Sequence, residues 1–236
     1  MTTPISIDGI RGILLDIEGT TTPIAFVHDV LFSYARTHVR DFLAKHLDDD
    51  AVQTDIRLLR DEAESEGFHA NNLDELVAYI NRLIDLDRKS TGLKLLQGKI
   101  WHEGYTDGTL RAQVFADVAP AFERWRAANK NVSIFSSGSV LAQKLLFAHT
   151  EAGDLTPFIN DYFDTSMGKK GEAESYRRIA EAIKLQPNEI LFVSDIVAEL
   201  AAAREAGMKT ALSIRPGNQP QASRDDYPII HSFDEL

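Results

Sequence analysis

Short apolar runs alternate with amphipathic helical segments over the second half of the chain, from Val118 onward. The expected strands are residues 131–135, 162–164, 189–193 and 209–214, and the expected helices are residues 118–129, 139–149, 172–184 and 197–206. A crossover helix between successive strands makes those strands parallel and places helices on both faces of the sheet. The alternation therefore predicts an α/β fold with a doubly wound parallel sheet.

The preceding stretch, residues 25–115, shows helical periodicity and contains no strand candidate. Two of its helices are expected at residues 51–67 and 73–86, with Asn72 as the N-cap of the second. An apolar stripe at three- and four-residue steps predicts one face of an earlier helix; its members are Ile24, Val27, Leu31, Tyr34, His38 and Phe42. Because residues 12–15 form a strand-like run before this stretch, we expect a helical module inserted after the first strand. The predicted domains are a core of residues 1–24 and 116–236 and an inserted module of residues 25–115.

Composition limits the classes of function that this chain can serve. With 236 residues, 44% of them hydrophobic, the chain can bury one sizeable core plus an inserted module. The absence of cysteine excludes disulfides, thiolate metal sites and cysteine nucleophiles. A net charge of −11 disfavours the nucleic-acid backbone as a partner. Since no basic and apolar leader begins the sequence and its apolar runs are too short to cross a bilayer, we expect a soluble protein.

A polar cluster accompanies each of four expected strands near its carboxyl end. The clusters are Asp16 with Glu18, Ser136-Ser137-Gly138-Ser139, Lys169-Lys170, and Ser194-Asp195 with Glu199. Taken singly, each has an ordinary structural explanation as a turn, a helix cap, a solvated lysine pair or a first-turn acid. Because the carboxyl ends of parallel strands meet at one edge of a sheet, however, all four clusters converge there. The ordered set predicts a ligand site at that edge.

Phosphoryl transfer through an aspartyl-phosphate is the chemistry that suits this set. A carboxylate nucleophile splits the hydrolysis into two steps, and a neighbouring acid protonates the leaving oxygen and then activates water. Asp16 and Glu18 can divide these roles. Because carboxylates and phosphate repel one another, the site needs Mg²⁺, for which Asp195 is the natural second ligand. Ser136 and the backbone N–H groups that follow it, that of Gly138 included, can cradle the phosphate, and a lysine can neutralise its charge.

These four clusters, in this order, resemble the loop motifs of the haloacid dehalogenase superfamily of phosphohydrolases. More narrowly, the chain is similar throughout to the enolase-phosphatases of the methionine salvage pathway. The stretches that carry this resemblance are DIEGTTTPIAFVHDVLF, FSSGSVLAQKLLFAHT, YFDTSMGKKGEAESYRRIA and IRPGN. It implies a cytoplasmic, Mg²⁺-dependent and usually monomeric enzyme. Such an enzyme enolises 2,3-diketo-5-methylthiopentyl-1-phosphate and then removes the phosphate to give the acireductone.

The resemblance also assigns roles to the acidic residues. Asp16 is implied to be the nucleophile and a metal ligand, and Asp195 the metal-binding acid of the last cluster. Glu18 stands where most phosphatases of the superfamily have aspartate, and is implied to serve as acid/base and in the metal site. The reference pKa of a glutamate, about 4.3, must rise for it to be a good acid near neutrality. Glu199 is a weaker candidate for a metal-site residue.

The remaining roles concern phosphate binding and the inserted helices. Ser136 and Ser137, with Gly138, are implied to bind the phosphate. Lys170 is implied to be the catalytic and substrate-binding lysine, because its spacing from Gly168 favours it over its neighbour. The inserted helices resemble a mobile cap. In its GKIWHEGY segment we expect a packed Trp101, an exposed His102 and no catalytic residue among these and Glu103 and Tyr105.

Three other functions remain open on the sequence. A different Mg²⁺-dependent phosphatase or phosphomutase of the same superfamily shares the motifs and differs mainly in the cap. A haloacid dehalogenase proper needs neither Mg²⁺ nor a glutamate at position 18. A phospho-acceptor module that uses Asp16 as a switch is disfavoured by Glu18, because a built-in hydrolytic base works against a lasting acyl phosphate.

Overall fold

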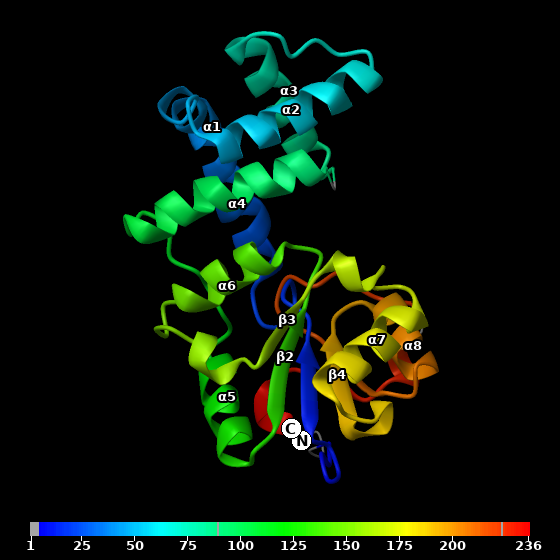
Figure 1. The fold of residues 1–236 in the computed structure, drawn as a ribbon. Coiled ribbons are helices and arrows are strands. Elements are labelled where there is room, and N and C mark those ends of the chain that lie inside the picture. The colour runs from blue at the N-terminus through cyan, green and yellow to red at the C-terminus, as the bar shows by residue number, and fades with distance from the viewer. Residues whose placement is uncertain (1–4, 89, 223) are drawn as a thin grey trace. The chain divides into compact units, whose positions relative to one another are not determined.

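The chain forms two compact units in the computed structural model, which describes residues 5–88, 90–222 and 224–236 (Figure 1). One unit comprises residues 1–27 and 111–236, and the other residues 28–110. The sequence placed the junctions after residues 24 and 115, whereas these units divide after residues 27 and 110. Residues 1–4, part of the stretch in which no leader was expected, lie outside the described residues.

A six-stranded parallel sheet is the centre of the first unit. Its strands are β1 (Gly12–Leu15), β2 (Asn131–Phe135), β3 (Asp161–Phe163), β4 (Ile190–Ser194), β5 (Lys209–Ser213) and β6 (Ile229–Ile230). Their order is β3-β2-β1-β4-β5-β6, and every neighbouring pair is parallel. The chain runs outward from β1 to β3 and then continues at β4 on the other side of β1. The gap between the carboxyl ends of β1 and β4 is therefore the topological switch point of the sheet, where open α/β folds bind their ligands.

Four helices cover the two faces of this sheet and confirm the doubly wound prediction (Figure 1). They are α5 (Val118–Ala127), α6 (Val140–Ala148), α7 (Ala173–Ile183) and α8 (Val197–Glu205). Each lies within a residue or two of its expected range. Short 3₁₀ helices occur at Thr156–Phe158, Thr165–Met167, Pro187–Glu189, Arg224–Asp226 and Phe233–Glu235. The sequence did not indicate β6, because a strand of two residues is too short to leave a period.

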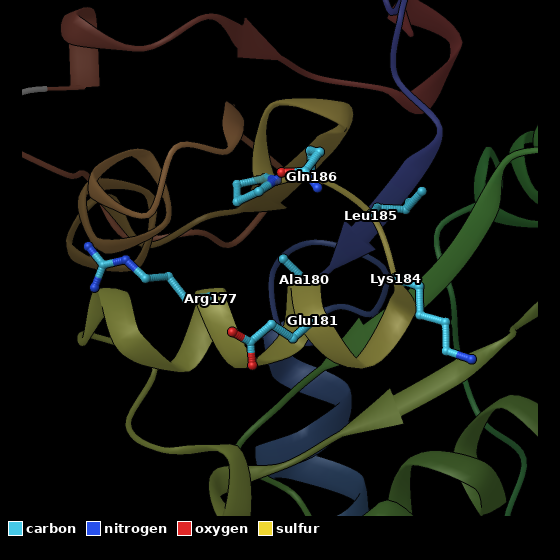
Figure 2. A pocket seen from close by; sticks show the side chains of 7 residues that line it. Arg177, Ala180, Glu181, Lys184, Leu185 and Gln186 are labelled. Atoms are coloured by element: carbon cyan, nitrogen blue, oxygen red, sulfur yellow. The ribbon is translucent and has the colours of Figure 1, made fainter.

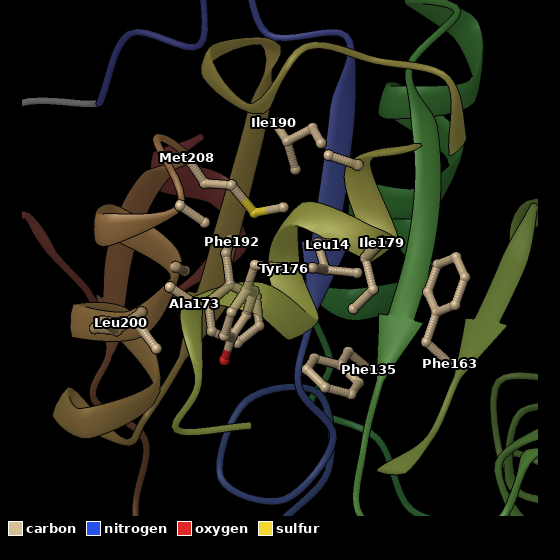
Figure 3. Packing of buried hydrophobic residues seen from close by; sticks show 14 of the residues in the cluster. Leu14, Phe135, Phe163, Ala173, Tyr176, Ile179, Ile190, Phe192, Leu200 and Met208 are labelled. Carbon is tan, nitrogen blue, oxygen red and sulfur yellow. The ribbon is translucent and has the colours of Figure 1, made fainter. Parts of the chain in front are cut away.

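The core between the sheet and α7 is organised around Tyr176 (Figure 3). Its ring meets Phe135 of β2 edge-on, with 5.5 Å between the ring centroids, and lies 5.0 Å from the ring of Phe192 of β4. The hydroxyl of this fully buried tyrosine donates a hydrogen bond of 2.7 Å to the backbone carbonyl of Lys170. The core therefore fixes the backbone of the segment that carries this lysine.

The second unit contains four α-helices. They are α1 (Ser33–Lys45), α2 (Asp50–Ser65), α3 (Leu73–Asp85) and α4 (Thr91–Thr106), and a π-helix, Phe26–Phe32, precedes α1. Between residues 28 and 110 the described residues contain no strand, as expected. The side chain of Asn72 accepts the Glu75 N–H at 2.9 Å, which confirms it as the N-cap of α3. No helix in the described part of the chain is long and apolar enough to span a membrane.

The prediction of an apolar stripe along the first helix is partly wrong. The sequence placed Tyr34 and His38 on the buried face, whereas the structure buries Ala35 and Val39 and leaves His38 exposed. The π-helix has more residues per turn than an α-helix, because its hydrogen bonds join residues five apart. Buried positions are therefore spaced further apart along the π-helix than along an α-helix. As a result, the buried positions of α1 lie one residue later than an α-helical period predicts.

Two substitutions at Tyr176 separate ring packing from hydrogen bonding. Tyr176→Ala removes a fully buried ring and is expected to lower the free energy of unfolding by about 3–5 kcal/mol. Tyr176→Phe keeps the ring and removes only the hydrogen bond to Lys170, with an expected loss of about 1 kcal/mol. Urea titration followed by circular dichroism measures both. Equal losses in the two variants would contradict this packing scheme.

Candidate active site

Asp16 lies buried at the switch point, directly after β1. Its backbone N–H donates to the Val193 carbonyl at 3.0 Å, so the ladder between β1 and β4 continues one residue beyond the strand. Its Oδ1 accepts the N–H of Ile17 at 2.7 Å and the ammonium group of Lys170 at 2.6 Å. The carboxylate is therefore held in one orientation by its own loop and by a cation.

A tight turn follows Asp16 and brings Gly19 against Asp195. The N–H groups of three consecutive threonines, residues 20–22, all point to the carbonyl of Ile17. Gly19 has a φ of +69°, and a Cβ there would overlap Asp195 Oδ2 and lie 2.7 Å from Asp195 Cγ. The metal-binding acid expected from the sequence is thus packed on the backbone of the turn that carries Glu18. The Glu18 side chain itself is half-buried.

The two adjacent lysines lie in different environments. The Lys170 side chain is 9% exposed, and its ammonium group lies 2.6 Å from Asp16 Oδ1 and 2.7 Å from Glu199 Oε2. The Lys169 side chain is 86% exposed and pairs with Glu172 at 3.4 Å. Burial alone would lower the pKa of Lys170, but the two carboxylates outweigh it and raise that pKa above its ordinary value. Lys170 is therefore the charged lysine of the cluster.

Asp195 and Glu199 bring two further carboxyl groups close to Asp16. Burial raises the pKa of Asp195 to about 7, and the nearby charges of Asp16 and Glu199 add to the effect. Burial and then Asp16 likewise raise the pKa of Glu199 to about 7, against the opposing influence of Lys170 and of the Ser194 hydroxyl. That hydroxyl lies 3.0 Å from Glu199 Oε2 and 3.4 Å from Asp16 Oδ2, and its single proton serves the nearer oxygen. The site thus brings together three carboxylates and one lysine, which pairs with Asp16 and Glu199 only.

This charge imbalance fits a hard divalent cation. No three His, Cys, Asp or Glu side chains of the described residues converge into a ready-made metal cage. Mg²⁺ needs no such cage, because it keeps several water molecules and binds through one or two carboxylates plus substrate oxygens. Asp16 and Asp195 are the two buried carboxylates at this edge of the sheet. The donor set does not suit structural zinc, which takes four protein ligands.

The serine-rich loop after β2 offers a hydroxyl proton to an anion. The hydroxyl oxygen of buried Ser136 accepts the Gly138 N–H at 3.2 Å, which leaves the hydroxyl proton able to point elsewhere. The Gly138 N–H is therefore engaged within the loop. Ser139 caps α6 by accepting the Ala142 N–H at 3.3 Å. Ser137 is half-buried in the same loop.

Comparison with known proteins decides which family this geometry belongs to. Residues 10–207 match the family model of the haloacid dehalogenase-like hydrolases. The protein named Enolase-phosphatase E1 of Synechococcus elongatus is 54% identical over 242 residues, which cover 100% of both chains. The chain belongs to the enolase-phosphatase E1 family. It is accordingly an enzyme, as the sequence predicted.

Two solved structures place the enolase-phosphatase fold among its relatives. The crystal structure of the UTR4 protein of Saccharomyces cerevisiae superimposes with a TM-score of 0.81 at 36% identity, over 96% of this chain and 100% of that one. The putative HAD-hydrolase YfnB of Bacillus subtilis, whose crystal structure is bound to magnesium, gives a TM-score of 0.56 at 16% identity over 96% of both chains. The second likeness shows a shared fold only.

Gln143 also contributes to this enolase-phosphatase site, although the sequence did not indicate a role for it. It is buried in the first turn of α6, and its Nε2 donates to the carbonyls of Gly138 and Phe163, each at 2.8 Å. The serine-rich loop is thereby tied to the end of β3. The only sequence signal for this contact is a single glutamine within an otherwise apolar helix.

The four residues of the GKIWHEGY segment that the sequence analysis considered lie on α4, within the helical unit. Trp101 is buried and donates its indole N–H to the Leu31 carbonyl at 2.8 Å, and His102 is exposed. Glu103 accepts hydrogen bonds from Lys45 at 2.9 Å and from His46 at 2.7 Å. Tyr105 is buried. These contacts account for Trp101 and Glu103 as structural parts of the helical unit.

A surface depression of about 510 Å³ lies along α7 and the turn before β4 (Figure 2). Its wall includes Leu185, whose Cδ1 would lie 2.8 Å from a Cβ at Gly12, the first residue of β1. The depression therefore sits at the amino ends of the strands, at the opposite edge of the sheet from Asp16. It is not the place where the reaction occurs.

Two glycine variants test the contact between the turn and Asp195. Gly19→Ala is expected to push Asp195 aside and lower phosphate release from an aryl phosphate by at least about 100-fold. Gly9→Ala is the matched control, since Gly9 also has a positive φ, +76°, but a Cβ there meets nothing within 4 Å. It carries the same backbone strain, about 1–2 kcal/mol, and should leave activity within about twofold of wild type. Equal loss of activity in both variants would refute the packing argument.

The buried carboxylates predict how stability depends on pH when no metal is bound. An aspartate titrates at about 3.9 in an unfolded chain but at about 7 at Asp195, so the folded state binds more protons between these values. The stabilising contribution is complete below pH of about 4 and is lost as the pH rises through about 7. In chelator, the melting temperature of wild type should therefore fall more steeply over this range than that of Asp195→Asn. Parallel curves for the two proteins would count against the raised pKa.

Proposed function

We propose that this chain is a bifunctional enolase-phosphatase of L-methionine salvage. It enolises 2,3-diketo-5-methylthiopentyl-1-phosphate and then hydrolyses the phosphate ester to give the acireductone, 1,2-dihydroxy-3-keto-5-methylthiopentene. Membership of the enolase-phosphatase E1 family supports the reaction pair. The observation that carries the phosphatase half is the buried Asp16 carboxylate, paired with Lys170 at the switch point of the sheet.

In the phosphatase step, Asp16 is the nucleophile. Its carboxylate attacks phosphorus, the bond between phosphorus and the ester oxygen breaks, and the leaving oxygen takes a proton from Glu18. Glu18 then removes a proton from a water molecule that attacks the aspartyl-phosphate. This second attack releases inorganic phosphate and returns both carboxyl groups to their starting states. The half-buried position of Glu18, two residues from Asp16 on the same turn, supports this division of roles.

Lys170 and the serine-rich loop bind the transferred phosphoryl group. Lys170 carries its charge into the site, where it can pair with the phosphate oxygens as well as with Asp16. Ser136 donates its hydroxyl proton, and Ser137 and Gly138 complete the loop around the phosphate. Gly138 must exchange its bond with Ser136 to donate to the ligand.

Asp16 and Asp195 would hold Mg²⁺ with their carboxylates, and Glu18, on the same turn as Asp16, would belong to the metal site. When bound, the metal offsets the charge of the carboxylates against the phosphate and stabilises negative charge on the substrate oxygens. The raised pKa of Asp195 supports this assignment, because a bound cation favours the ionised carboxylate that burial disfavours.

A time course with the diketo phosphate and Mg²⁺ tests the whole proposal. Ultraviolet absorbance of the conjugated enol should rise before inorganic phosphate appears, and the acireductone should be the product. If phosphate appears first, and solvent deuterium never enters recovered substrate or enol, the enolase half fails and a plain phosphatase of the same superfamily remains.

We also propose that the enzyme works as a monomer in the cytoplasm. The resemblance of the whole chain to enolase-phosphatases supports the monomer, and a cysteine-free sequence is compatible with a reducing compartment. Light scattering coupled to size-exclusion chromatography measures the mass in solution. A mass of twice the 26.3 kDa chain would contradict the monomer.

Asp16→Asn separates the two reactions. The amide neither attacks phosphorus well nor binds Mg²⁺ as tightly, so phosphate release should fall by at least about 1000-fold. Enolisation does not require this nucleophile, and with excess Mg²⁺ the enol phosphate should still form slowly. Asp8→Asn, on the exposed N-terminal segment, is the control and should keep both activities. Phosphate release by Asp16→Asn at a tenth of the wild-type rate would rule out the nucleophile role.

A further inference from the structure

The segment after β5 binds the turn that follows Asp16. Arg215 Nε donates to the Thr20 carbonyl at 3.3 Å, and Asn218 Nδ2 donates to the Gly19 carbonyl at 2.9 Å. Two side chains almost two hundred residues away in the sequence therefore bind consecutive carbonyls of the turn that begins at Glu18. Nothing in the phosphoryl-transfer scheme described above uses them.

Arg215 is a rigid support for this segment. It is 6% exposed, and its guanidinium pairs with Asp117 at 2.7 Å and donates to the His231 carbonyl at 2.8 Å. The rings of Phe115 and Phe233 each lie 4.7 Å from its central carbon. Since a planar guanidinium held by bonds and by two rings has little freedom, the neighbouring Asn218 is presented to the turn in a fixed position.

The amide group of Asn218 leaves one oxygen unused. Its Nδ2 donates to the carbonyls of Gly19 and Ser213, the second at 3.2 Å. These bonds fix the orientation of the amide, because the flipped amide would point its oxygen at two other oxygens. Asn218 Oδ1 is consequently buried and has no hydrogen-bond donor among the described residues. An acceptor in this state destabilises the folded protein, and such atoms in native structures call for an explanation.

This unused oxygen faces the same space as Asp195. A Cβ at Gly19 would lie 2.9 Å from Asn218 Oδ1 and would overlap Asp195 Oδ2. Two acceptor oxygens therefore border one small space above the Gly19 backbone with no proton donor between them. A hydrogen-bond donor that comes with a bound ligand, and not from the protein, would satisfy both oxygens.

We propose that Asn218 is a positioning residue of the metal site, whose Oδ1 accepts a hydrogen bond from a water molecule bound to Mg²⁺. This inference rests on the proposed Mg²⁺ dependence. Mg²⁺ gives up its water reluctantly, and metal-bound water is a strong hydrogen-bond donor. Groups that orient the ligands of a metal in this way typically change its affinity or the activity by about 10–100-fold. Asn218 touches neither phosphate nor nucleophile and acts through the metal-bound water.

Mg²⁺-induced stabilisation, measured without substrate, tests the role apart from activity. A ligand that binds only the folded state stabilises it by RT ln(1 + [L]/Kd), so the melting temperature rises with the Mg²⁺ concentration once that concentration exceeds the dissociation constant. For Asn218→Ala, the Mg²⁺ concentration that produces a given rise in melting temperature should increase by about tenfold or more. Asn218→Asp keeps an acceptor oxygen and loses only the donors, so the Mg²⁺ concentration that it needs for the same rise should not exceed that of wild type. Gln219→Ala, which removes the neighbouring exposed amide, should match wild type.

The variants distinguish this role from a purely structural one. If Asn218→Ala binds Mg²⁺ as wild type does, or if the alanine and aspartate variants lose affinity equally, the amide acts only by holding Gly19 and the inference is overturned. If Asn218→Ala does not fold in chelator, the aspartate variant decides, and a tenfold weaker response in it overturns the inference. If wild type itself shows no rise with Mg²⁺, the proposed metal fails and this inference fails with it.

Discussion

The ion pairs of one buried lysine organise this active site. Lys170 lies between Asp16 and Glu199 at hydrogen-bond distance from both, and its backbone is tied to the core through the Tyr176 hydroxyl. A buried lysine with two carboxylates is stable only while its charge is kept, and Asp195 adds a third carboxylate that no lysine balances. This excess of carboxylates over lysine is therefore the feature that suits the site for a divalent cation and a phosphate together.

The topology of the sheet determines which residues can meet at this point. β1 lies between β2 and β4, so the loops after these three strands approach one another at their carboxyl ends. Asp16, Ser136 and Asp195 are each the first residue beyond these strands, at the edge where other doubly wound folds bind their ligands. The tight turn at Gly19 brings Asp195 closer still, because only a residue without a Cβ fits there.

Local patterns in the sequence predicted the sheet, its helices and the acids at the strand ends, because each leaves a period or a motif within a few residues. The choice between two lysines was also accessible, from their spacing to Gly168. The π-helix before α1 was not, since nothing in its apolar spacing distinguishes a π turn from an α turn. Gln143 and Asn218 were missed because their partners are loops brought near by the fold, and a single polar residue carries no record of such contacts.

The proposed mechanism depends on a covalent aspartyl-phosphate, and a quenched single turnover detects it most directly. Glu18→Gln should form the intermediate from a reactive aryl phosphate and Mg²⁺ but hydrolyse it slowly, because the base that activates water is missing. Acid quenching followed by peptide mass spectrometry should then find phosphate on Asp16 in near-stoichiometric amount. Release of the aryl alcohol with no phosphorylated peptide, or phosphate on a different residue, would contradict the account.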